Sequence, residues 1–348
     1  MITVGESLSV DIYGSVALKL LIDRSVYGGI KYQWIKSMNN NETEARELTT
    51  SPERLRELYR SAIEVHRTVA AREVHRTLAN NPNTPIDILQ LLACDRDEAI
   101  RFFVARNPST PADTLEMLAH DHAFVGSSRT SVHSNVGLNP NTPNRILELL
   151  AQDIECSIRG CVAKNPNLPI ALLRTLAQDE SSIVRFSVAS NLSTPVDLLR
   201  LFASDKCEFT RCCVAKNPST SADILESLSQ DRFHRVRTAV AGNFHTSAST
   251  LERLFSNCQA IGNSFKNRKN GDTGDTMISD LAKVNFQATG FFDPEIWFQE
   301  YENFILAIAE NPNTPLHILR ILNCYPTGPM LAKALQNCVA RNPNWNSN

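Results

Sequence analysis

The chain has 348 residues, a formal net charge of −2 and hydrophobic residues at 42% of its positions. This composition is sufficient to bury a continuous core. The near-neutral net charge argues against a general affinity for nucleic acid, but it does not exclude a local stripe of basic residues on one surface. No uncharged apolar run approaches the roughly 20 residues that span a bilayer, so we predict no membrane partner.

The first 47 residues lie outside any repeat. We expect this segment, 1–47, to cap a repeat array, because a terminal unit must cover its open apolar face. A small separate interaction module is the alternative. The segment begins without basic residues and carries Glu6 and Asp11, so it does not resemble a signal peptide. The cysteines number nine, with several at apolar repeat positions, which favours reduced thiols in the cytoplasm.

Beyond the first segment, one asparagine recurs at regular intervals, usually followed by proline. It stands at Asn81, Asn107, Asn139, Asn165, Asn191, Asn217, Asn243, Asn311 and Asn342. From Asn139 to Asn243 the successive members are 26 residues apart, and a fixed period of this size is the signature of a solenoid. We therefore expect a repeat solenoid over 48–255, an insertion over 256–304 and further repeats over 305–348.

Each repeat has the pattern of two short helices, such as 179–189 and 194–203, with apolar residues on one face. Segments this short are unstable alone, so stacking must stabilise them. Proline after the asparagine moves that asparagine out of the helical region and ends the first helix. Threonine before proline, as in Thr194-Pro195, predicts a side-chain cap on the second helix, and Asp197 faces its positive end.

The insertion contains a polar loop over 263–275 and a helical segment over 276–286. Asp293-Pro294 then opens a longer helix, which carries the aromatic residues Trp297, Phe298, Tyr301 and Phe304. Insertions of this kind cluster on one face of a solenoid, often the binding face.

Two charged columns emerge when the repeats are aligned on the asparagine. Six residues before it stand Arg101, Arg159, Arg185, Arg211 and Arg237, and twelve before it stand Asp95, Asp153, Asp179, Asp205 and Asp231. One interpretation is a structural ladder in which arginine pairs with aspartate. The other is a stripe that grips an anionic ligand, because guanidinium binds carboxylate and phosphate with two parallel hydrogen bonds. The asparagine column itself is predicted to be structural, because an amide in a turn can bond backbone groups of its own and the next repeat.

A third column lies just before the asparagine and is basic in Arg106, Lys164, Lys216 and Arg341. It is predicted to face solvent, as either a recognition surface or a plain solvated edge. Aromatic residues for nucleic-acid stacking do not recur in that register. The candidate binding residues are therefore Arg101, Arg106, Arg159, Lys164, Arg185, Arg211, Lys216 and Arg237.

Signals for metal binding or catalysis are weak. His120, His122 and His133 are the best metal candidates, but no cysteine or acid with ligand spacing completes a set. The vicinal pair Cys212-Cys213 is a redox candidate, and small core filling is the alternative. No phosphate-binding glycine loop, nucleophile elbow or HExxH motif occurs in the sequence. We predict no catalytic residue, no metal and no cofactor, and whether the protein is an enzyme stays open.

The repeated pattern resembles the leucine-rich repeat variant family. Val184-Arg185 through Asp205 carries its motif nearly whole, and the resemblance covers roughly residues 50–255 and 305–343. It implies a right-handed superhelix that alternates α-helices with 3₁₀-helices, so either short segment of a unit can be 3₁₀. The founding type resembles an iron–sulfur protein with a cysteine cluster before its repeats. Here no cysteine precedes Cys94, so no cluster is implied.

Together these patterns predict an all-α, right-handed superhelical solenoid of about ten two-helix units with an N-terminal cap. The expected function is non-catalytic binding of a protein or peptide along the concave face. Nucleic-acid binding through the arginine and lysine columns is the alternative, and an enzyme that uses the 256–304 insertion is the third candidate.

Overall fold

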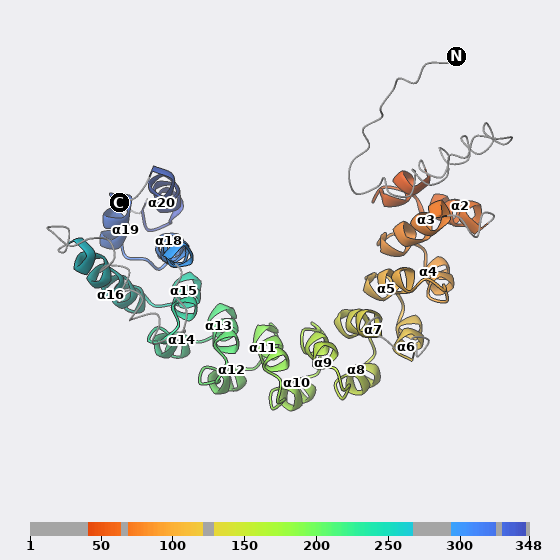
Figure 1. Ribbon diagram of the computed structural model, residues 1–348, viewed down its shortest axis with the longest axis horizontal. Helices are drawn as coiled ribbons and strands as arrows, with labels where there is room; N and C mark the ends of the chain where they lie inside the picture. Colours follow the sequence, from red (N-terminus) through yellow and green to blue (C-terminus); the bar gives the residue numbers. More distant parts are fainter. Residues whose placement is uncertain (1–40, 64–68, 121–128, 267–293, 325–328, 346–348) are drawn as a thin grey trace, which may run out of the picture. The chain divides into compact units, whose positions relative to one another are not determined.

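The computed structural model describes residues 41–63, 69–120, 129–266, 294–324 and 329–345, and no strand occurs among them (Figure 1). The chain divides into two compact units, Met1–Ile146 and Leu147–Asn348, which we describe separately. The predicted N-terminal cap up to residue 40 and the predicted helix over 276–286 lie outside the described residues.

The first unit opens with a short helix over 41–46. It continues with α2 (Pro52–Ile63), α3 (Val69–Asn80), α4 (Ile86–Leu92), α5 (Glu98–Arg106), α6 (Ala112–Ala119) and α7 (Arg129–Leu138). Helix α8 (Asn144–Leu150) crosses the division between the units. Within this unit α3 packs on α2 and α5, α5 packs on α7, and α4 and α6 contact the helices that follow them.

The second unit continues the same alternation, with helices in two rows (Figure 1). One row, the first helices, holds α9 (Cys156–Ala163), α11 (Ser182–Ser190), α13 (Glu208–Lys216), α15 (His234–Gly242), α18 (Pro294–Glu310) and α20 (Pro329–Arg341). The other row, the second helices, holds α10 (Ile170–Leu176), α12 (Val196–Phe202), α14 (Ala222–Leu228), α16 (Ala248–Lys266) and α19 (Leu316–Asn323). The first helices pack directly on one another, and α10, α12 and α14 each contact the first helices before and after them.

The two-helix unit predicted from the sequence is confirmed, and so is the longer helix that follows Asp293-Pro294. Both segments of each described repeat are α-helical, so the alternation with 3₁₀-helices that the resemblance implied does not occur in these residues. The predicted boundaries at 255 and 304 fall within α16 and α18, so on both sides the flanking repeat helices continue into the insertion.

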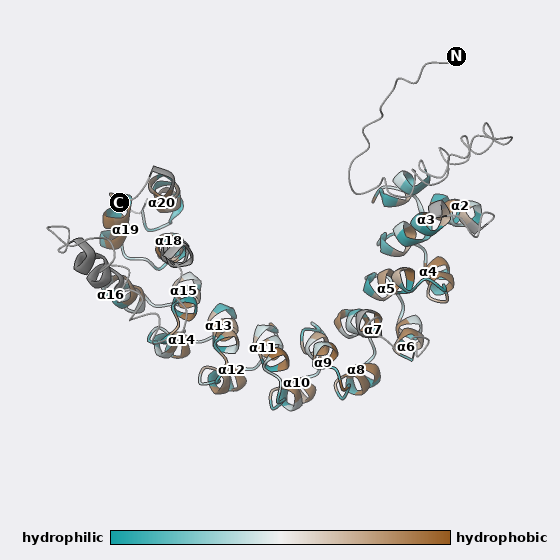
Figure 2. Cartoon of the chain, in the orientation of Figure 1, coloured by the Kyte–Doolittle hydropathy of each residue, from teal (hydrophilic) through white to brown (hydrophobic). Residues whose placement is uncertain are grey.

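The core lies between the two rows. In one repeat, Val184 and Val188 of α11 and Leu199 of α12 are fully buried, and Phe202 is among the largest buried side chains. Burying such a side chain stabilises the fold by about 1.5–3 kcal/mol, which compensates for helices too short to persist alone. Figure 2 accordingly shows both apolar and polar residues on the helices of the second unit.

The recurring asparagine ties each repeat to the one before it. Asn191 Nδ2 donates to the carbonyl oxygens of Ala163 and Asn165 at 2.8 and 2.9 Å, and its Oδ1 accepts from the Ser193 amide at 2.9 Å. Equivalent bonds are made by Asn81, Asn107, Asn139, Asn217, Asn243, Asn311 and Asn342. The predicted structural role is confirmed, although the carbonyl partners belong to the preceding repeat and not to the next.

Proline is not required to end the first helix at this position. Asn191 and Asn243 precede Leu192 and Phe244, yet both keep an extended backbone, with ψ of 130° and 126°. Asn217, which does precede proline, has a ψ of 126°. We infer that the amide bonds of the asparagine hold this turn, and that proline reinforces it.

The predicted threonine cap is wrong. Pro195 is the N-cap residue of α12, and no side chain caps that helix. Thr194 Oγ1 instead donates to the carbonyl oxygen of Val188 at 2.5 Å, which closes the C-terminal end of α11. The same bond is made by Thr84, Thr110, Thr142, Thr220, Thr246 and Thr314. The hydroxyl therefore satisfies a carbonyl of the helix behind it, not an amide of the helix ahead.

Candidate binding surface

The arginine column of the second unit is paired with the aspartate column. Arg185 donates Nε and Nη2 to the two carboxylate oxygens of Asp205, at 2.7 and 3.2 Å. Its Nη1 donates to the carbonyl oxygen of Asp179 at 2.9 Å. Arg159 with Asp179 and Arg211 with Asp231 repeat this arrangement. Each arginine thus joins its own repeat to the next one.

The aspartates complete the ladder by ordering the turn before each first helix. Asp179 Oδ1 accepts from the Ser181 amide at 2.9 Å, and Asp205 Oδ1 accepts from the Cys207 amide at 2.7 Å. The hydrogen bond from Arg159 lowers the pKa of the Asp179 carboxyl below its ordinary value, although burial opposes this effect. The carboxylate is therefore charged at neutral pH and stays matched to its guanidinium.

The remaining members of the arginine column also bond the backbone. Arg101 Nη1 donates to the carbonyl oxygens of Asp95 and Arg96, and Arg237 Nη1 donates to those of Asp231 and Arg232. In the first unit His75 takes the same column position, with Nδ1 3.2 Å from Asp95 Oδ2. The geometry matches the structural interpretation of this column, and it weighs against Arg159, Arg185 and Arg211 as residues that grip a ligand.

The basic column before the asparagine faces solvent, as the sequence predicts. Arg106, Lys164 and Lys216 are exposed. Lys164 Nζ lies 5.8 Å from the centre of the Phe186 ring on the next first helix, within reach of a cation–π interaction. This column is therefore the part of the predicted binding set that stands at the surface.

Apolar side chains accompany these cations on the first helices of the second unit. Ile183 on α11 and Phe209 on α13 occupy the same repeat position and are 42% and 53% exposed, and Phe186 is half-buried. We call the set Lys164, Ile183, Phe186, Phe209, Lys216 and Arg235 the first-helix surface. Aligning the repeats with one another did not identify these aromatic residues as a surface, although Phe102 and Phe186 share the position five residues before the asparagine.

Arg235 links the charged and the aromatic parts of this surface. Its guanidinium carbon lies 5.2 Å from the centre of the Phe209 ring, and Nη1 lies 3.3 Å from Glu208 Oε1. A cation stacked on an exposed ring presents both an apolar face and hydrogen-bond donors to a ligand.

A hollow of about 620 Å³ opens between α13, α15 and α18. Phe209, Lys216 and Arg235 line it together with Gly242 and Phe244. His234 also lines it, and burial, aided by the nearby Arg237, lowers the pKa of this imidazole to about 4, so the ring is neutral at neutral pH. In the first unit a second hollow of about 500 Å³ lies beside Phe102 and Phe103.

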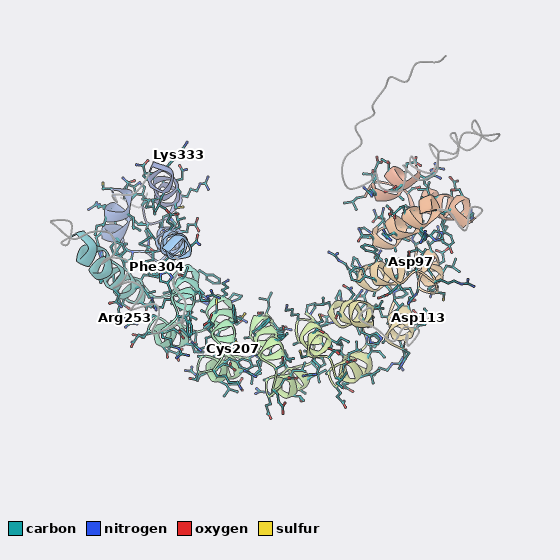
Figure 3. All side chains as sticks on the ribbon, in the orientation of Figure 1. Asp97, Asp113, Cys207, Arg253, Phe304 and Lys333 are labelled. Carbon is teal, nitrogen blue, oxygen red and sulfur yellow. The ribbon has the colours of Figure 1, made fainter. Side chains whose placement is uncertain are left out.

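Figure 3 marks Phe304 on α18 in the first-helix row and Arg253 on α16 in the second-helix row.

The described residues hold no group of three or more His, Cys, Asp or Glu side chains that could bind a metal. His122 of the proposed histidine set lies outside them, as do residues 267–293 of the insertion. Cys212 and Cys213 are both free thiols, and burial raises the pKa of Cys212. Among the described helices, none is long and apolar enough to cross a membrane.

Stacked two-helix units joined by asparagine and arginine ladders define an all-α repeat protein. A family model described as "leucine rich repeat variant" matches residues 98–122, which contain α5 and α6. The predicted resemblance is confirmed, and these residues are similar to the repeat unit of that family.

The chain was also compared with solved structures and with curated proteins. A solved structure titled "A leucine-rich repeat variant with a novel repetitive protein structural motif" is 23% identical, with 66% of this chain and 81% of that chain covered and a TM-score of 0.39. Comparison with curated proteins gave no match.

Proposed function

We propose that the protein is a non-catalytic scaffold that binds a protein or peptide segment along the first-helix surface of its second unit. The repeat fold suits a binding role, because stacked repeats present one extended surface. The observation that carries the proposal is the exposure of Ile183 and Phe209 at the same position of consecutive repeats. Contiguous exposed apolar side chains rimmed by charges are typical of interaction sites.

The first helices are better placed for this role than the second helices. They pack directly on one another, so side chains of successive repeats join into one surface. The second helices also expose apolar residues, among them Ile170, Val196 and Leu201. Cross-repeat ion pairs occur on both rows, as Arg200–Asp223 on the second helices and Arg235–Glu208 on the first, so the choice of the first helices rests on their aromatic residues. The exposed Phe209 and the half-buried Phe186 belong to the first helices, and aromatic side chains contribute much of the binding energy at interfaces.

Nucleic acid remains the alternative partner, but the structure offers it fewer contacts than the sequence suggested. Of the predicted arginines, Arg159, Arg185 and Arg211 are occupied by carboxylates. The exposed cations Lys164 and Lys216 are interspersed with acids such as Glu208. A phosphate-binding site would lose affinity steeply as salt rises. An oligonucleotide whose binding shows that loss, and which competes with peptide, would favour the alternative.

Free thiols at eight of the nine cysteines support the cytoplasm as the proposed compartment, where reduced cysteines persist.

Peptide selection tests the proposed function. Binders are selected from a displayed random-peptide library against the wild-type protein, and their affinities are measured for the variants Ile183→Ser and Phe209→Ser. We expect each variant to weaken the binders about tenfold or more, the cost of losing an interface contact worth more than about 1.4 kcal/mol. Leu201→Ser, on a second helix and 60% exposed, is the matched control and should change nothing.

Two results would contradict this function. One is a selection that returns no binder at all. The other is a set of binders that Leu201→Ser weakens while Ile183→Ser and Phe209→Ser leave them unaffected, since the binding surface would then lie on the second helices.

A further inference from the structure

The hollow between α13, α15 and α18 is bordered on α15 by small residues. On α15 the positions five, four and one before the asparagine are Thr238, Ala239 and Gly242. On α5 the same positions hold Phe102, Phe103 and Arg106. The volume of this hollow is about 620 Å³, within the range of about 300–1,000 Å³ common for ligand sites.

Gly242 lines this hollow and places no side chain in it. A Cβ atom added there would meet only the Ala307 Cβ, at an ordinary contact distance of 3.9 Å. The glycine is therefore not needed for close helix packing. Lys164 and Lys216 occupy its position in earlier repeats and are exposed, so a lysine at 242 would extend over the hollow.

Two phenylalanines and two cations line the hollow, and one of the cations, Arg235, is also paired with Glu208 on α13. Phe209 and Phe244 are 53% and 51% exposed. Lys216 and Arg235 line the same space, His234 is neutral there, and no aspartate or glutamate is among the described lining residues. Such a site favours a flat apolar group that has a carboxylate beside it.

We infer that this hollow is the anchor site of the binding surface, and that it takes an aromatic side chain flanked by a carboxylate in a bound peptide. The inference rests on the proposed function and names its partner class. A peptide fits better than a small molecule, because exposed Ile183 continues the apolar surface beyond the hollow, where a longer segment can reach it. The phenylalanines that line the hollow provide its apolar contact with the aromatic side chain of the peptide, and Lys216 binds the carboxylate.

Four pools of synthetic peptides test this assignment. All have the same length, with phenylalanine or serine at the centre and either glutamate or lysine on both sides. We expect the pool with phenylalanine and glutamate to bind at least about tenfold more tightly than the other three. Lys216→Glu should shift the preference toward the pool with phenylalanine and lysine. Gly242→Lys should weaken the preferred pool about tenfold, and Gly242→Ala, which leaves the hollow open, should not.

The variants separate failure of the anchor from failure of the proposed function. Ile183 does not line the hollow, so Ile183→Ser reports on the rest of the surface. If Ile183→Ser weakens peptide binding while Gly242→Lys and Lys216→Glu do not, the anchor assignment is wrong and the scaffold function stands. If none of the three has an effect, both are wrong. A single-stranded oligonucleotide that binds and is released by Lys216→Glu would overturn the peptide assignment in favour of a nucleic acid. Circular dichroism of Gly242→Lys confirms that this variant is folded.

Discussion

Replacement of Asn191 by alanine is expected to lower the free energy of unfolding by about 4 kcal/mol, because each buried polar group left without a partner costs about 1–3 kcal/mol. The amide is 5% exposed and bonds three backbone groups, the carbonyls of Ala163 and Asn165 and the amide of Ser193. The Ala163 carbonyl and the Ser193 amide would lose this partner at once, and the Asn165 carbonyl would keep only its bond from the Leu168 amide. Chemical unfolding followed by circular dichroism measures the change.

Asn313 provides the matched control for this experiment. Its Nδ2 also donates to two carbonyls of the preceding repeat, Phe244 and Thr246, but the side chain is exposed. Water can replace these bonds, so Asn313→Ala should cost less than about 1 kcal/mol. Asn191→Asp keeps the size of the side chain but removes the donor, and should destabilise at least as much as alanine. Equal effects of Asn191→Ala and Asn313→Ala would show that the asparagine column does not hold the repeats together.

Replacement of Arg185 by methionine is the second large expected effect, at about 3–5 kcal/mol, because it leaves a buried charge without its partner. The side chains of Arg185 and Asp205 are each only 9% exposed. Methionine fills part of the arginine volume but cannot match the carboxylate or bond the carbonyls of Asp179 and Glu180. Thermal and chemical unfolding of the variant measure the loss.

The exposed pair Arg174–Asp197 is the control, with side chains 49% and 60% exposed. Arg174→Met should change the free energy of unfolding by less than about 1 kcal/mol, as is typical of surface ion pairs. Adding Asp205→Asn to Arg185→Met removes the unpaired charge while keeping an acceptor for the Cys207 amide, so stability should partly recover. An Arg185→Met variant as stable as Arg174→Met would mean that the buried arginines are not structural and are available to a ligand.

The sequence predicted the repeating fold well because its signals are local. The spacing of the asparagines defines the unit, and apolar positions such as Val184 and Val188 identify the buried faces. The threonine cap was wrong for a physical reason. A threonine hydroxyl at a turn can bond either a carbonyl of the preceding helix or an amide of the following helix, and the geometry of the turn decides between them. Thr194 bonds the carbonyl of Val188 in the preceding helix.

The site was harder to predict, because its chemistry depends on which repeats face each other. Arg185 has aspartates in its own repeat and in the next one, and the sequence alone cannot show that Asp205 binds its guanidinium while Asp179 offers a carbonyl. The hollow depends on small residues of α15 and on α18, which returns to the stack only after the insertion. The position shared by Phe102 and Phe186 was the available signal for the aromatic surface.

The asparagine and arginine ladders hold the stack, whereas the first-helix surface binds the partner. Hydrogen exchange of the wild-type protein, with and without the tightest selected peptide, separates these two roles. We expect the peptide to slow exchange in α11, α13 and α15 and to leave α10, α12 and α14 unchanged. Protection confined to α10, α12 and α14 would contradict it, because the partner would then lie on the second helices.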